Sequence, residues 1–139
     1  MKWLMDTMVL SEPMRPHPNP AIGAWIDLHD EWDLYLSVLT IGELRKGVAK
    51  LAEGRRRAQL VHWLESDVKK RFAGRILPID LEIAETWGRL IGQAGASGKV
   101  LPAVDSLIAA TALQHGMIVV TRNVGDFAAA GVPVENPWS

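Results

Sequence analysis

Four carboxylic side chains, at Asp6, Glu43, Asp105 and Asp126, stand beside the expected ends of strands or starts of helices. Carboxylates that cluster cannot all ionise unless a cation neutralises them. The chain has no cysteine, and its four histidines are far apart. An oxygen-only cluster suits Mg²⁺ or Mn²⁺ rather than zinc. Because such ions activate water for in-line displacement at phosphorus, the residues indicate metal-dependent phosphodiester hydrolysis.

Each acid also has an ordinary structural role open to it. Thr40 and Glu43 have the spacing of a capping box. Asp105 would complement a helix N-terminus, and Asp126 would hold a turn through its own backbone. Asp6 would cap the loop after its strand. Four such placements at one edge of a sheet are harder to attribute to these local roles.

The elements that must position these acids alternate between short apolar runs and helical periodicity. We expect strands at 3–5, 34–38, 75–79, 117–121 and 132–134, and helices at 20–29, 40–51, 60–68, 80–94 and 102–114. Strands that alternate with helices form a parallel sheet, because each crossover needs a helix to return the chain. Ligands of such sheets gather beyond the carboxyl ends of the strands. Glu43 then falls in the first turn of a helix, and Asp126 in a loop.

Composition indicates one globular domain, since the 139 residues are 48% hydrophobic and 22% charged. The net charge of −1 conceals a basic block, defined as residues 45–75, with ten basic and three acidic residues, against five basic and thirteen acidic elsewhere. This block is either the solvated face of a helical pair or a surface for nucleic acid or an acidic partner. Within it, we expect Arg45 to face substrate because it lies close to Glu43.

The start of the chain meets Asp6 before an apolar signal-peptide core can form. The uncharged stretch at 106–121 is shorter than the roughly 20 residues of a membrane span. We therefore expect a soluble, cytoplasmic protein with no membrane partner.

Several sequence blocks, in this order and spacing, carry a resemblance over essentially the whole chain. They lie at residues 4–12, 36–47, 72–78, 105–112, 121–127 and 136–138. The chain resembles the PIN-domain ribonucleases, specifically the VapC-type toxins of toxin–antitoxin systems and their FitB-like branch. The resemblance implies a three-layer α/β/α fold with a mainly parallel central sheet, and a single PIN domain over residues 1–139.

The resemblance also assigns roles to residues. Asp6, Glu43, Asp105 and Asp126 would form the catalytic quartet that binds Mg²⁺ or Mn²⁺, with Thr121 and Asn123 supporting them. Related proteins place the fourth acid at the position of either Asn123 or Asp126, and here only Asp126 is charged. The expected activity is that of an endoribonuclease toxin whose substrate is RNA. The expected partners are a small DNA-binding antitoxin, whose tail covers the acidic pocket, and a second copy in a homodimer within that complex.

One departure from the family pattern concerns Met8, which stands where these proteins usually have asparagine after Asp-Thr. A thioether cannot hold a water or a carboxylate as an amide does. Losses of this kind commonly cost about 10–100-fold in metal affinity or activity. An alternative is therefore a catalytically weakened subunit that acts mainly as a binding partner in an antitoxin–operator DNA complex. A phosphoacceptor receiver domain fits less well, because Asp6 lacks an acidic neighbour and Arg122 is not the lysine such a domain needs.

Overall fold

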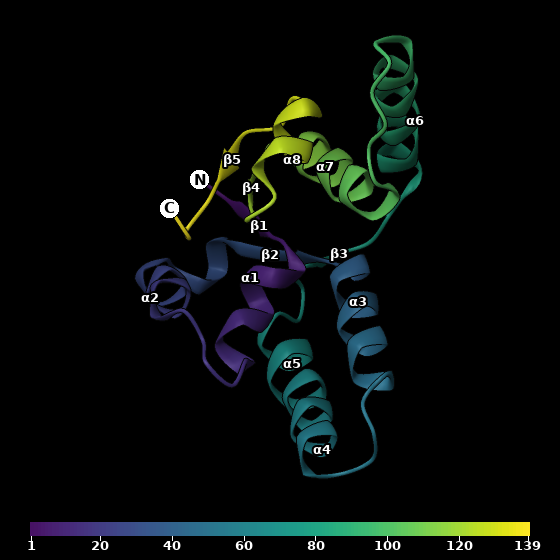
Figure 1. Ribbon diagram of the computed structural model, residues 1–139. Helices are drawn as coiled ribbons and strands as arrows, with labels where there is room; N and C mark the ends of the chain where they lie inside the picture. Colours follow the sequence, from purple (N-terminus) through teal and green to yellow (C-terminus); the bar gives the residue numbers. More distant parts are fainter.

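A computed structural model describes residues 1–139 and has a five-stranded parallel sheet at its centre. The strands are β1 (Trp3–Met5), β2 (Leu34–Ser37), β3 (Ile76–Leu77), β4 (Ile118–Val120) and β5 (Val134–Glu135). They lie in the order β3-β2-β1-β4-β5, so the chain changes direction across the sheet between β1 and β4. Helices cover both faces (Figure 1). The predicted three-layer α/β/α architecture is confirmed.

Alternation of side chains along the strands builds one core on each face of the sheet. Met5 and Val120 belong to the core on one face of the sheet, and Leu4 and Val119 to the core on the other face. All four are fully buried. The two cores fix the register of the central strands, because a slip of one residue would exchange their faces.

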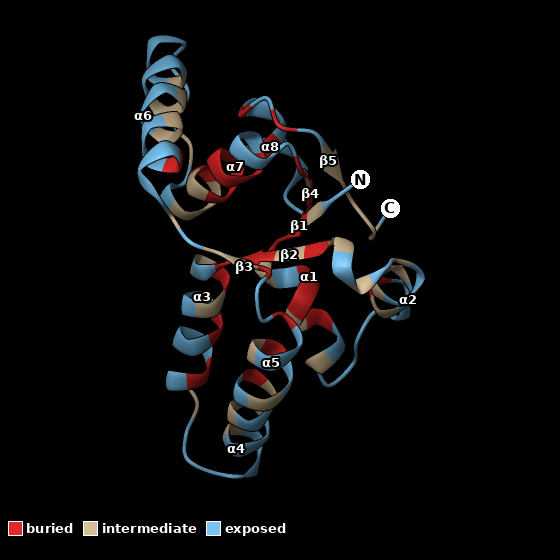
Figure 2. Cartoon of the chain, turned by 180° about the vertical axis from the view of Figure 1, so that it is seen from behind, coloured by how far each residue is buried: buried red, intermediate tan, exposed pale blue.

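The layer below the sheet in Figure 1 contains α1 (Thr7–Ser11), α2 (Pro20–Leu28), α3 (Val38–Ala49) and a rod over residues 55–71. The rod comprises α4 (Arg55–His62), a π-helical segment (Trp63–Val68) and α5 (Lys69–Arg71). The opposite layer contains α6 (Leu81–Ala96), α7 (Ala103–His115) and α8 (Val124–Ala129). Two 3-10 turns cover Glu12–Met14 and Glu31–Asp33. Figure 2 shows buried residues on the strands, on α7, on α1 and on the side of α3 that faces α1 and α5.

Capping side chains explain several helix starts that the sequence predicts. Asn19 accepts a hydrogen bond from the backbone of α2 and Asp80 from that of α6. Gly116 ends α7 in the left-handed conformation, with φ of 65°. None of the helices has the length and apolarity needed to cross a bilayer.

The capping box considered for Thr40 and Glu43 is wrong. α3 begins at Val38, where the Ser37 hydroxyl accepts from the Leu39 backbone N–H at 3.0 Å. Ser37 follows the strand directly and has extended backbone dihedrals, so it satisfies the first free N–H groups before Thr40 is reached. Thr40 is consequently a buried residue inside the helix, and Glu43 lies in its second turn.

Two helices are absent from the sequence prediction. α1 follows β1 at once, and α8 occupies the segment assigned as a loop around Asp126. Their five and six residues span fewer than two turns, too short for apolar periodicity to be recognised. Asp6 starts α1 by accepting from the Thr7 backbone N–H at 2.8 Å.

The basic block is not a single charged surface. Arg75 belongs to it by sequence but is buried, with 4% of its surface exposed. Its guanidinium donates to the backbone carbonyls of Glu31, Leu34 and Arg71. Its Cζ lies 4.9 Å from the ring centroid of Trp32. The side chain thus joins the end of the rod at 55–71 to the segment before β2.

We expect Arg75→Met to lower the free energy of unfolding by about 3 kcal/mol. Hydrogen bonds from a charged donor are worth about 1.5–3 kcal/mol each, and three carbonyls lose their shared partner. Urea unfolding measures the loss. Arg71→Ala is the matched control: it removes an exposed ion pair to Glu31 and should cost less than about 1 kcal/mol. Equal losses in the two variants would contradict the structural role of Arg75.

Candidate active site

Asp6 lies at the carboxyl end of β1, beside the end of β4, and is 6% exposed. Its Oδ2 accepts from the Thr121 hydroxyl at 2.8 Å, and its Oδ1 accepts from the Thr7 backbone N–H at 2.8 Å. The Asp6 backbone N–H continues the sheet by donating to the Val120 carbonyl at 2.9 Å. Both carboxylate oxygens are therefore held in one orientation by neighbouring elements.

Asn123 connects two further acids. Its side-chain amide nitrogen lies 2.9 Å from Asp105 Oδ2 and 2.9 Å from Asp126 Oδ2. Asp105 comes from the first turn of α7, and Asp126 from the first turn of α8. The two protons of one amide thus satisfy two carboxylates from different helices. The Asn123 backbone N–H donates to the Thr121 hydroxyl at 2.9 Å, which joins this group to Asp6.

Glu43 is exposed and reaches the cluster through Thr7. The Thr7 hydroxyl donates to Glu43 Oε1 at 2.6 Å and lies 3.2 Å from the Thr40 hydroxyl. Thr40 sits one helical turn before Glu43 and is fully buried. Thr7 and Thr40 were not predicted as site residues. Their signal in the sequence is the adjacency of Thr7 to Asp6 and the three-residue spacing from Thr40 to Glu43, which places both on one face of α3.

The electrostatics of the cluster oppose ionisation of its two most enclosed acids. Burial raises the pKa of Asp6, against the lowering effect of its hydrogen bonds from Thr121 and Thr7. Burial also raises the pKa of Asp105, and the negative charges of Asp6, Glu43 and Asp126 add to this. The other three predicted acids therefore lie close enough to act on Asp105 as like charges.

The donor set fits a hard divalent cation, because it consists of carboxylate, hydroxyl and amide oxygens with no thiolate or imidazole. The repulsion at Asp105 is of the kind that a bound cation relieves. No three acidic or histidine side chains are gathered at metal-ligand spacing in the structure. Each of the four carboxylates instead accepts a hydrogen bond from Thr7, Thr121 or Asn123.

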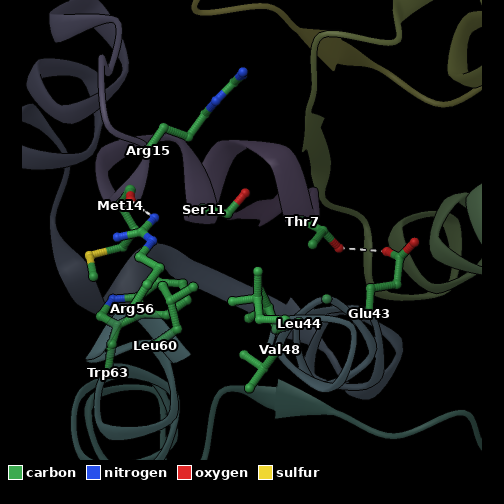
Figure 3. A pocket seen from close by; sticks show the side chains of 12 residues that line it. Thr7, Ser11, Met14, Arg15, Glu43, Leu44, Val48, Arg56, Leu60 and Trp63 are labelled. Atoms are coloured by element: carbon green, nitrogen blue, oxygen red, sulfur yellow. Dashed lines mark hydrogen bonds between the residues drawn. The ribbon is translucent and has the colours of Figure 1, made fainter. Parts of the chain in front are cut away.

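A groove of about 340 Å³ opens beside Glu43 and runs between α1, α3 and α4. Figure 3 shows Thr7 and Glu43 at one end, and Leu60 and Trp63 at the other. Leu44 and Val48 contribute to its apolar lining, and Arg15 and Arg56 stand among its lining residues. Glu43 therefore joins the acidic cluster to a groove whose lining residues are half hydrophobic and half polar or glycine.

Arg45 does not stand free to face the cluster. Its guanidinium pairs with Glu65, which Lys69 also contacts at 2.9 Å. The hydrogen bond from Lys69, assisted by that from Arg45, lowers the pKa of Glu65. The expectation that Arg45 faces substrate is therefore replaced by a charge network between α3 and the rod at 55–71.

The fold and the site together define a class: a parallel α/β/α protein with an acidic, oxygen-only cluster where its two central strands end. The sequence model of the PIN domain matches residues 4–132. This chain belongs to the PIN-domain family.

Relatives agree with this membership over nearly their whole lengths. Toxin FitB of Neisseria gonorrhoeae is 47% identical over 135 residues, covering 97% of each chain. VapC ribonuclease Y4jK of Sinorhizobium fredii is 44% identical, covering 97% of this chain and 96% of that protein. The solved structure of FitAB bound to an IR36 DNA fragment matches with a TM-score of 0.94 at 45% identity, covering 99% of this chain and 96% of the other.

We expect Asp105→Asn to raise the melting temperature near neutral pH in the presence of EDTA. The raised pKa means that the native state resists ionisation of Asp105 more than the unfolded state does. Wild-type stability from this group therefore falls as the pH rises through the raised native pKa. The advantage of the Asp105→Asn variant should disappear below about pH 4, where the unfolded carboxyl is also protonated.

Thermal unfolding across this pH range measures the difference between wild type and variant. Asp67→Asn, which removes an exposed acid from the rod at 55–71, is the matched control and should leave the melting temperature nearly unchanged. A lower melting temperature for Asp105→Asn at neutral pH would show that the carboxylate is not electrostatically strained.

Proposed function

We propose that this protein is a Mg²⁺- or Mn²⁺-dependent endoribonuclease that acts as the toxin of a toxin–antitoxin module. The observation that supports this proposal is a set of hydrogen bonds beyond the ends of β1 and β4: Thr121 donates to Asp6, Thr7 to Glu43, and Asn123 to both Asp105 and Asp126. Relatives named Toxin FitB and VapC ribonuclease support it. We propose that residues 1–139 act as one PIN domain in the cytoplasm.

Asp6, the most buried of the four acids, would hold the cation together with the half-buried Asp105 and Asp126, and the exposed Glu43 would complete the site. When bound, such an ion activates a water and stabilises the oxygen that leaves phosphorus. Thr121 keeps the Asp6 carboxylate in place, and the Asn123 amide orients Asp105 and Asp126. These contacts orient the carboxylates before substrate arrives, and a bound cation would draw them to metal-ligand spacing.

Glu43 has a further role in proton transfer. Thr7 occupies its Oε1, whereas no protein donor is bonded to its Oε2. Because Glu43 is exposed at the mouth of the cluster, Oε2 is available to accept a proton from water. Glu43 would therefore both complete the cation site and exchange protons with solvent.

The proposed partners are RNA as substrate, a small DNA-binding antitoxin, and a second copy of the chain in the toxin–antitoxin complex. The similar solved structure is of FitAB bound to a DNA fragment, which supports an antitoxin partner that contacts DNA. The groove beside Glu43 would receive an apolar part of the antitoxin tail against Leu44, Val48 and Leu60, and the tail would then close the acidic cluster.

Asp6→Asn should reduce RNA cleavage in Mn²⁺ by at least about 100-fold, because it removes one charge from the most buried ligand position. Cleavage of a labelled RNA and calorimetric titration with Mn²⁺ measure activity and metal affinity separately. Asp67→Asn is again the control and should retain both. Full activity in Asp6→Asn would exclude the proposed site.

The alternative of a weakened subunit is favoured by Met8, whose side chain is 44% exposed in the first turn of α1 and makes no polar contact. Such a protein would act mainly by binding its antitoxin on operator DNA. Loss of an amide beside the acids would weaken metal binding without removing the ligands themselves.

Met8→Asn should raise Mn²⁺ affinity or RNA cleavage by about tenfold if the amide supports the site. Titration and cleavage assays compare the variant with wild type, and Met8→Leu serves as the nonpolar control. A wild-type protein that neither binds Mn²⁺ at millimolar concentration nor cleaves RNA would favour the binding role. Equal activity in all three proteins would show that residue 8 is not part of the site.

A further inference from the structure

Three consecutive residues after β4 have different tasks, and the middle one is not used by the carboxylate cluster. Thr121 donates to Asp6, and Asn123 donates to Asp105 and Asp126. Arg122 lies between them and is exposed. The hydrogen bonds of its two neighbours fix the backbone that carries Arg122 at the border of the acidic site.

Trp138 holds the guanidinium of Arg122. The Arg122 Cζ lies 5.5 Å from the centroid of the Trp138 ring, within the range of a cation–π contact. The contact with the ring uses none of the N–H donors of Arg122. The guanidinium also makes no ion pair or hydrogen bond with the protein. Its N–H donors therefore remain available while its position is restrained.

The Trp138 ring is itself part of a fixed structure. It is half-buried and packs against the core that contains Met5 and Val120. The Trp138 backbone N–H donates to Asn136 Oδ1 at 2.9 Å. The segment that leads to it begins in β5, whose Glu135 carbonyl accepts from the Thr121 backbone N–H at 3.0 Å. One sheet edge thus positions both the arginine and the ring beneath it.

Several other arginines form ion pairs with a neighbouring glutamate. Arg15 contacts Glu12, Arg45 contacts Glu65, and Arg89 contacts Glu85. Arg122 differs because its restraint comes from an aromatic face and leaves its charge uncompensated. A polyanion that approaches four carboxylates is repelled, and a fixed cation at the border of the cluster offsets that repulsion. A guanidinium also matches the geometry of phosphate oxygens.

We propose that Arg122 binds a phosphate of single-stranded RNA at the border of the carboxylate cluster, and that Trp138 is a positioning residue that holds Arg122 for this contact. This inference rests on the proposed ribonuclease function. The contact fixes the register of the RNA backbone and carries no base preference. Arg122 supplies the positive charge that binds the phosphate, and Trp138 holds that charge in position.

The test measures binding of a fluorescein-labelled single-stranded RNA in EDTA, by anisotropy at several salt concentrations. Arg122→Ala should raise Kd about tenfold and reduce the slope of log K against log salt by about 0.7, the value for one phosphate contact on a single strand. Trp138→Leu should raise Kd while keeping most of the slope, because the charge remains. Trp138→Phe should restore binding, because the aromatic face returns. Arg89→Ala, an exposed arginine on α6, should change neither quantity.

Kinetics and metal titration separate this inference from the function on which it rests. In Mn²⁺, Arg122→Ala should raise KM with kcat within about twofold, and its Mn²⁺ affinity should equal that of wild type. Unchanged Kd and slope in Arg122→Ala, with a wild type that binds and cleaves RNA, would overturn the inference alone. Reduced Mn²⁺ affinity in Arg122→Ala would also overturn it, since the residue would then act through the loop. A wild type that neither binds nor cleaves RNA would overturn the proposed function itself.

Discussion

The hydrogen bond from Thr121 to Asp6 joins the two central strands at the place where both end. It lies inside the protein, between a fully buried hydroxyl and a carboxylate that is 6% exposed. The other members of the candidate site are arranged around it. Thr7 follows Asp6 directly at the start of α1, and Asn123 lies two residues beyond Thr121. Because β1 and β4 flank the point where the chain reverses direction across the sheet, helices from both layers bring their acids to the same region.

A cluster of this kind opposes folding in the absence of a cation. Burial and mutual repulsion act against ionisation of Asp6 and Asp105, while the amide of Asn123, the hydroxyl of Thr121 and the backbone N–H of Thr7 compensate in part. Stability must come from elsewhere, and the two apolar cores on the faces of the sheet provide it. Such strain is expected where a protein keeps ligands ready for a charged partner.

Local patterns in the sequence were sufficient where one short-range interaction decides the outcome. Asn19 and Asp80 cap helices because each is a short polar residue directly before a helical run. Local patterns failed where two residues compete to cap the same helix. Thr40 has the spacing of a cap, but Ser37 lies at the end of β2 and caps α3. They also failed for α1 and α8, whose length shows no periodicity, so Asp126 was expected in a loop.

The sequence by itself determined the chemistry available to the site: oxygen donors, no thiolate, and acids placed next to the elements that carry them. It also determined the parallel sheet, because alternating strand and helix patterns allow few other topologies. Only the tertiary structure decided which side chains meet. Thr121 reaches Asp6 across 115 positions of the chain, and Asn123 selects Asp105 across 18. The contacts of the buried Arg75 and the pairing of Arg122 with Trp138 also join residues that are distant in the sequence. Residue type sets what a side chain is able to do, but a nonlocal contact depends on how the packed layers bring distant segments together.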